Sequence, residues 1–176
     1  MLEPGQDRKV AALTTNVYVR YFLWSEMMNN NEYYIKKALE LAYEAYQNNE
    51  IPVGAIIVKD DIIIGSAYNS KDKDKIVTKH AELLAIENAS KHLGDWRLNG
   101  CTIYVTMEPC PMCASAIQQA RIDKLVYGCS SNIDDNNKIL YSILQNSSYN
   151  HTVKIEGKIL EEECSKLIKD FFALKR

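Results

Sequence analysis

Two short segments constrain the possible folds of this chain more than any other feature. The first is His80-Ala81-Glu82, and the second is Pro109-Cys110-Pro111-Met112-Cys113. Together they contain one imidazole, two thiols and a carboxyl group. Three such metal ligands leave the fourth tetrahedral position of a zinc ion open, as in catalytic zinc sites. If they bind one ion, the chain must fold so that its residue 80 meets its residues 110–113.

The spacing of these residues predicts how they are presented. Cys110 and Cys113 are three residues apart at the start of a predicted helix, which places both sulfur atoms on one helical face. A helix N-terminus favours negative charge and lowers the thiol pKa, so both cysteines would bind as thiolates. His80 begins another predicted helix. Glu82 is the nearby acid that we assign to proton transfer. The pattern H-x-E followed by P-C-x-x-C is the known signature of zinc-dependent nucleobase deaminases.

Other interpretations of these segments remain open at this point. A C-x-x-C pair alone is also typical of redox sites and of structural zinc sites, and a structural site needs a fourth protein ligand. Glu108 is also close in sequence, and we expect it to be a structural partner of backbone groups or of an arginine. The candidates for a fourth ligand have no partner at the usual ligand spacing; they are Cys101, Cys129, Cys164, His92 and His151.

Composition restricts the cellular setting. With 176 residues the chain is expected to form one main domain. Its net charge of −2 provides no overall positive field, so an RNA partner would need a local patch of Lys and Arg. Five cysteines at irregular spacing, without a signal peptide pattern, predict a reducing compartment and therefore a cytoplasmic protein. No apolar run approaches the roughly 18 residues of a membrane span.

The periodicity of the chain predicts an α/β domain over residues 32–176. Residues 1–31 are expected to be an irregular N-terminal extension, and translation beginning at Met27 or Met28 is one hypothesis for it. Helices alternating with strands after an opening hairpin predict a mixed five-stranded sheet with helices on both faces. The predicted helices are 32–49, 80–93, 110–120 and 159–174, and the predicted strands are 53–58, 62–67, 101–106, 124–127 and 151–156.

From about Tyr33 to Arg176 the chain resembles the bacterial tRNA-specific adenosine deaminases, which belong to the cytidine-deaminase-like superfamily. The metal motif is common to that whole superfamily, whereas the flanking segments point to the tRNA branch. The matching segments are IPVGA at 51–55, Tyr68-Asn69, HAE at 80–82, YVTMEPCPMCA at 104–114, ARI at 120–122, VYG at 126–128, Asn150-His151 and Phe171-Phe172.

This resemblance implies a three-layer cytidine-deaminase-like fold and a homodimer with one Zn2+ per subunit. It implies hydrolytic conversion of adenosine to inosine at the wobble position of a tRNA anticodon. The carried-over roles are zinc binding by His80, Cys110 and Cys113, proton transfer by Glu82, and substrate binding by Asn69, the backbone amide of Ala81 and Asn150. The Phe171-Phe172 pair resembles family residues that contact neighbouring nucleotides. Two alternatives stay open: Asn69 could cap a turn, and at least one of the two phenylalanines could belong to the core.

One segment departs from the family. Residues 129–138 have no glycine, and Ser131 stands where an acidic substrate contact is usual, which puts the substrate in more doubt than the reaction. The first alternative is therefore a deaminase of free guanine or cytosine, or of a nucleoside, which would use the same zinc and Glu82. The second is a catalytically silent zinc-binding scaffold, whose usual sign is loss of the glutamate that Glu82 provides here.

Overall fold

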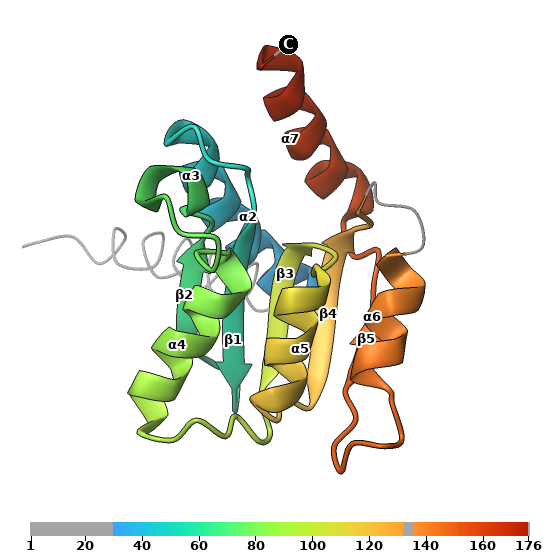
Figure 1. The fold of residues 1–176 in the computed structure, drawn as a ribbon. Coiled ribbons are helices and arrows are strands. Elements are labelled where there is room, and N and C mark those ends of the chain that lie inside the picture. The colour runs from blue at the N-terminus through green and yellow to red at the C-terminus, as the bar shows by residue number, and fades with distance from the viewer. Residues whose placement is uncertain (1–29, 132–135, 176) are drawn as a thin grey trace, which may run out of the picture.

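The computed structural model describes residues 30–131 and 136–175 (Figure 1). The prediction of an extension over residues 1–31 lies almost entirely outside these ranges, as do Met27 and Met28. The elements are α2 (Asn30–Gln47), β1 (Gly54–Lys59), β2 (Ile62–Tyr68), α3 (Lys71–Asp74), α4 (Ala81–Leu93), β3 (Thr102–Met107), α5 (Pro111–Gln119), β4 (Lys124–Cys129), α6 (Asn136–Leu144), β5 (Lys154–Glu156) and α7 (Glu161–Leu174).

The five strands form one mixed sheet in the order β2-β1-β3-β4-β5. Strand β1 is antiparallel to both β2 and β3, whereas β4 is parallel to both β3 and β5. The opening hairpin supplies the antiparallel edge, and the later strands are joined through helices, as parallel neighbours require. The predicted mixed five-stranded sheet is thus confirmed.

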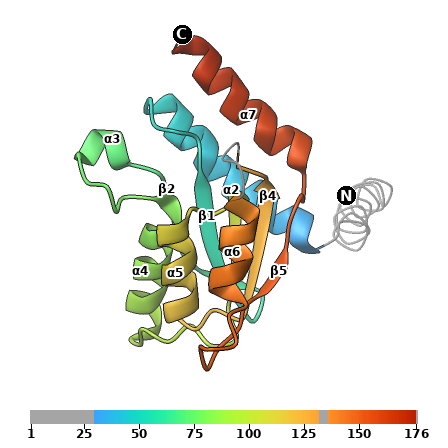
Figure 2. The same ribbon diagram turned by 45° about the vertical axis from the view of Figure 1, so that its right-hand side comes forward.

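Helices cover both faces of this sheet. Helices α4, α5 and α6 lie on one face, while α2 and α7 lie on the other (Figures 1 and 2). The side chains of the central strands alternate between the two layers because successive residues of a strand point to opposite faces. Ile57, Ile103 and Leu125 form a row across β1, β3 and β4 in the first core, and Ile56, Tyr104 and Val126 form the adjacent row in the second.

Two glycines allow helices to lie directly against the hairpin. A Cβ atom at Gly65 of β2 would lie 2.5 Å from the carbonyl oxygen of Ala85 in α4. At Gly54 of β1 it would overlap the carbonyl oxygen of Ala38 in α2. Any side chain at either position would push a helix away from the sheet. The close packing of α4 matters for function because this helix begins next to His80.

Two helices differ from the expectation drawn from the sequence. The single-turn α3 lies in the segment 71–75, whose charge pattern favours a loop. Helix α6 is not among the predicted helices, because its first residues are polar and resemble a loop. Leu140 and Leu144, however, are spaced by four residues and both are buried. Strand β5 is shorter than the predicted strand 151–156. Within the described residues, no helix is both long enough and apolar enough to cross a bilayer.

Candidate metal centre and active site

The three predicted metal ligands meet where two helices begin. His80 is the N-cap residue of α4 and Cys110 is the N-cap residue of α5, both with extended backbone conformations. Neither side chain caps its own helix, so both are available to the space between the helices. Cys113 lies in the first turn of α5 and is buried. The two helix N-termini favour negatively charged groups at this point.

The distances fit a single zinc ion. The Nδ1 atom of His80 lies 3.7 Å from Sγ of Cys110 and 3.5 Å from Sγ of Cys113. All three ligand atoms lie within 4.8 Å of one another. Tetrahedral zinc with Zn–S bonds of about 2.3 Å and Zn–N bonds of about 2.0 Å separates nitrogen from sulfur by about 3.6 Å. The residues present therefore fit zinc with little rearrangement.

Among the described residues, no fourth His, Cys, Asp or Glu completes this cluster. Cys101, Cys129 and Cys164 are buried in the two hydrophobic cores. His92 is exposed at the end of α4, and a ring nitrogen of His151 lies 2.8 Å from the carbonyl oxygen of Ile122. The arrangement of three protein ligands is that of a catalytic site and not of a closed structural one.

The two thiols and the imidazole lie within hydrogen-bond distance of one another, and each changes the pKa of its neighbours. A hydrogen bond from the Cys113 thiol lowers the pKa of Cys110 to about 4, and the same hydrogen bond raises the pKa of Cys113. A hydrogen bond with Cys110 raises the pKa of His80. Metal binding releases protons from such ligands, so a zinc cation bound here would displace the protons of the thiols and the imidazole.

Glu82 lies beside this cluster in the first turn of α4. Its side chain is only 4% exposed. Burial raises the pKa of the Glu82 carboxyl group, since the charged form is poorly solvated there. A carboxyl group whose pKa is shifted toward neutrality is suited both to accept and to return a proton.

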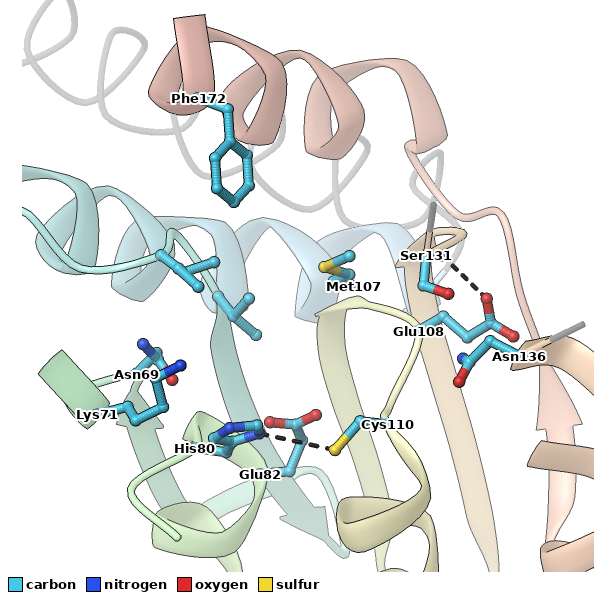
Figure 3. A pocket seen from close by; sticks show the side chains of 12 residues that line it. Asn69, Lys71, His80, Glu82, Met107, Glu108, Cys110, Ser131, Asn136 and Phe172 are labelled. Atoms are coloured by element: carbon cyan, nitrogen blue, oxygen red, sulfur yellow. Dashed lines mark hydrogen bonds between the residues drawn. The ribbon is translucent and has the colours of Figure 1, made fainter. Parts of the chain in front are cut away.

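Two of the three candidate ligands, His80 and Cys110, line one pocket of about 250 Å³ together with Glu82 (Figure 3). This is slightly below the roughly 300–1,000 Å³ of pockets for drug-sized ligands, which suits a single nucleobase. Figure 3 shows His80, Glu82 and Cys110 at its base, with the ring of Phe172 directed toward it from α7. The lining residues are Ile51, Val53, Asn69, Lys71, His80, Glu82, Met107, Glu108, Cys110, Ser131, Asn136 and Phe172.

The other predicted substrate contacts are divided between the pocket and the rest of the molecule. Asn69 lines the pocket, and its side-chain amide donates a hydrogen bond to Glu50. Ala81 is the first residue of α4, where backbone N–H groups have no partner within the helix. Asn150 lies between α6 and β5 and does not line the pocket; its Oδ1 accepts a hydrogen bond of 2.5 Å from Arg121. Its role in substrate binding remains a prediction.

The two phenylalanines of α7 have different surroundings. Phe171 is buried, whereas Phe172 is 45% exposed and lines the pocket, so one of the pair belongs to the core. Glu108 accepts a hydrogen bond from the backbone N–H of Ser131, which confirms the expected backbone partner. Ser131 also lines the pocket, and residues 132–135 after it lie outside the described ranges.

Sequence reasoning missed several residues of the pocket. Asn136 is buried at the start of α6, and its side-chain amide donates to the carbonyl oxygen of Pro109, which joins α6 to the segment that carries the candidate ligands Cys110 and Cys113. Lys71 lies on the unpredicted α3. Met107 ends the largely buried strand β3, and its place just before Glu108 was the available signal. Glu50, which contacts Asn69 from outside the pocket lining, had no sequence signal of its own.

Comparison with known proteins defines the class of this domain. Residues 28–129 match the family described as the cytidine and deoxycytidylate deaminase zinc-binding region. A tRNA-specific adenosine deaminase of Bacillus subtilis is 39% identical over 145 residues, which is 82% of this chain and 90% of the relative. One from Aquifex aeolicus is 43% identical over 141 residues, covering 80% and 93% of the two chains.

Solved structures agree with this class. One from a study of A-to-I editing by tRNA:A34 deaminases at the wobble position aligns with a TM-score of 0.70 and 33% identity, covering 77% of this chain and 98% of the other. A guanine deaminase from Bacillus subtilis aligns with a TM-score of 0.55 and 41% identity, covering 58% and 66%. The chain belongs to the zinc-binding deaminase family and, within it, to the tRNA-specific adenosine deaminases.

Proposed function

We propose that this protein converts adenosine to inosine by hydrolysis at the wobble position of a tRNA anticodon. The observation that carries the proposal is that His80, Cys110, Glu82 and Asn69 line one pocket of base size. Cys113 is buried next to them and completes the metal-ligand cluster. The relatives named tRNA-specific adenosine deaminases align with most of the chain, which supports a tRNA adenosine as the substrate. We further propose one zinc ion per subunit, a homodimer and a cytoplasmic location, the last in keeping with five free cysteines.

His80, Cys110 and Cys113 would hold the zinc ion. Bound there, zinc would act as a Lewis acid that lowers the pKa of water to about 7 and so makes a nucleophile available at neutral pH. Glu82 accepts one proton of the attacking water and delivers it to N1 of adenine as the oxygen of that water adds to C6. Glu82 then takes the remaining proton from the water-derived oxygen on C6 and passes it to the exocyclic amino group. The C6–N bond breaks as the C6=O bond of inosine forms, and ammonia leaves. The products are inosine and ammonia, so water is the only co-reactant.

The remaining residues of the pocket hold the base. Asn69 can both donate to and accept from a base edge, and it lies on the wall beside His80 (Figure 3). Phe172 provides an aromatic face above the pocket. Bases in anticodon loops are unpaired, so one can turn into such a pocket without the opening of a duplex. These features favour a base presented by a single-stranded loop.

The test is an incubation with an anticodon stem-loop that carries adenosine at the wobble position, read as inosine by nuclease digestion and mass spectrometry. Glu82→Gln should lower kcat by about 10²- to 10⁴-fold while zinc content stays the same. Glu87→Gln is the matched control because Glu87 lies on the same helix, is exposed and pairs with Lys91. Equal loss in both variants, or full activity of Glu82→Gln, would refute the role of Glu82.

A second candidate function is deamination of free guanine, which the aligned guanine deaminase structure favours. The same wild-type protein is given free guanine, cytosine and adenosine beside the stem-loop, and ammonia release is measured. We expect ammonia from the stem-loop alone. Ammonia from guanine without inosine in the stem-loop would replace the tRNA proposal by this alternative.

A further inference from the structure

Glu50 is a buried carboxyl group that the proposed mechanism does not use. It follows α2, and only 1% of the residue is exposed. Burying a carboxylate is costly unless hydrogen-bond donors surround it. Three donors do so here, from parts of the chain about twenty residues further on: the side-chain amide of Asn69 and the backbone N–H groups of Asp72 and Lys73. Such an arrangement calls for an explanation beyond core packing.

The backbone contacts of Glu50 replace a missing helix cap. Residues 72 and 73 lie in the first turn of α3, where N–H groups have no partner within the helix. Ser70 is the N-cap residue, but its side chain makes no cap hydrogen bond and instead donates to Asp74. The Oε2 atom of Glu50 accepts from Asp72 at 3.2 Å, and Oε1 accepts from Lys73 at 2.5 Å. Glu50 therefore fixes α3 against the end of α2.

The side chain of Glu50 contacts Asn69, a residue that lines the pocket. The Nδ2 atom of Asn69 lies 3.0 Å from Oε2 of Glu50, and the backbone N–H of Asn69 donates to the carbonyl oxygen of Val53 at 3.0 Å. Asn69 is itself buried and lines the pocket. A carboxylate has only acceptors, whereas an amide has a donor end and an acceptor end. Contact with Glu50 therefore selects the amide orientation in which Nδ2, and not Oδ1, faces the carboxylate.

We propose that Glu50 is a positioning residue that fixes the amide orientation of Asn69 and thereby the hydrogen-bond pattern offered to the base. With Nδ2 held by Glu50, Asn69 presents Oδ1 and the second N–H of Nδ2 to the pocket. A rotation of the amide by 180° would exchange the positions of Oδ1 and Nδ2. The donor and acceptor of Asn69 would then no longer match those of the base edge. This inference rests on the proposed function, because it concerns a base bound beside Asn69.

The test is a double-mutant cycle of Glu50→Gln and Asn69→Ala, measured as kcat/KM on the anticodon stem-loop. Glu50→Gln keeps the shape but can face Asn69 with either end of its own amide. We expect a loss of about 10- to 100-fold in the wild-type background, the worth of one hydrogen bond to a charged group, and less than about 2-fold in the Asn69→Ala background. Equal losses in both backgrounds would mean a purely structural role and would overturn the proposal.

Tyr104→Phe is the control for general loss of stability. Tyr104 is also buried, and its hydroxyl donates to Asn31 in the core on the α2 side, away from the pocket lining. We expect this variant to lower the melting temperature without changing kcat/KM in either background. If it reproduces the loss caused by Glu50→Gln, the effect of Glu50 is one of stability and the proposal fails.

A measurement on the wild-type protein separates this proposal from the proposed function. The Asn69 side-chain NH2 signals are assigned in a ¹⁵N-labelled sample by their disappearance in Asn69→Ala. Held by Glu50 in a buried site, these protons should exchange with water at least about 10-fold more slowly than those of exposed asparagine side chains. Exchange at the exposed rate would overturn the proposal. This result is independent of whether any RNA is deaminated and of whether Glu50→Gln folds.

Discussion

Replacing each of the two adjacent phenylalanines of α7 by alanine should separate folding from substrate binding. Phe171 is 4% exposed; its ring centroid lies 5.8 Å from that of Tyr46, and Nζ of Lys175 lies 4.4 Å from it. Phe172 is 45% exposed and lines the pocket. The two side chains have the same chemistry, so differences between the variants report their surroundings.

The stability effects follow from burial. An aromatic side chain buries about 150–250 Å², and at about 25 cal/mol per Å² the nearly complete burial of Phe171 is worth about 4–6 kcal/mol. Alanine keeps part of this burial, so Phe171→Ala should lower the free energy of unfolding by about 3–5 kcal/mol, or about 6–20 °C in melting temperature for a chain of this size. Phe172→Ala removes a side chain that is about half covered and leaves no closed cavity, so about 1–2 kcal/mol is expected.

The kinetic effects should have the opposite order. Stacking of a base on an aromatic ring is worth about 1–3 kcal/mol, so Phe172→Ala should lower kcat/KM on the stem-loop by about 5- to 150-fold. Phe171→Ala, assayed well below its melting temperature, should change kcat/KM by less than about 3-fold. Urea unfolding and steady-state kinetics on both variants provide the test. A larger stability loss at Phe172, or unchanged kinetics there, would refute the reasoning.

Three further outcomes are expected. Cys113→Ser should lose bound zinc, measured by mass spectrometry of metal content, and should lose inosine formation with it; activity without zinc would contradict the site. Gly65→Ala should lower the free energy of unfolding by about 1–3 kcal/mol in urea, because a Cβ atom would lie 2.5 Å from the carbonyl oxygen of Ala85, and an unchanged midpoint would contradict the close packing. Binding of the stem-loop should weaken linearly in log–log form as salt rises, with a slope of about −0.7 per phosphate contact, and salt-independent binding would argue against RNA.

Periodicity in the sequence predicts most of the fold. The long helices and the central strands lie within a few residues of their predicted bounds, because a buried stripe or an alternating face repeats over several turns or residues. Helix α3 escapes such a prediction since it has a single turn, no buried residue and a cap from Glu50 far away in sequence. Helix α6 escapes it because its polar start resembles a loop.

The candidate metal cluster follows from the sequence for a chemical reason. His80, Cys110 and Cys113 must all be specific ligand types at fixed spacing, and the N-terminal ends of α4 and α5 bring them together. The residues that would hold the base are not restricted to specific residue types at a fixed spacing. A polar or aromatic residue such as Asn150 or Phe171 has the same appearance in the sequence whether it faces a pocket, a neighbouring loop or the core.

Residue types and their local spacing were enough to predict the candidate zinc ligands, the acid Glu82 and the order of the long helices and strands. The packing of the helices on the sheet determines that Phe172 and not Phe171 lines the pocket, and that Oδ1 of Asn150 accepts a hydrogen bond from Arg121. The same packing places the carboxyl group of Glu50 against the side-chain amide of Asn69. Contacts of this kind join segments that are distant along the chain, and their geometry is set by how the helices pack on the sheet.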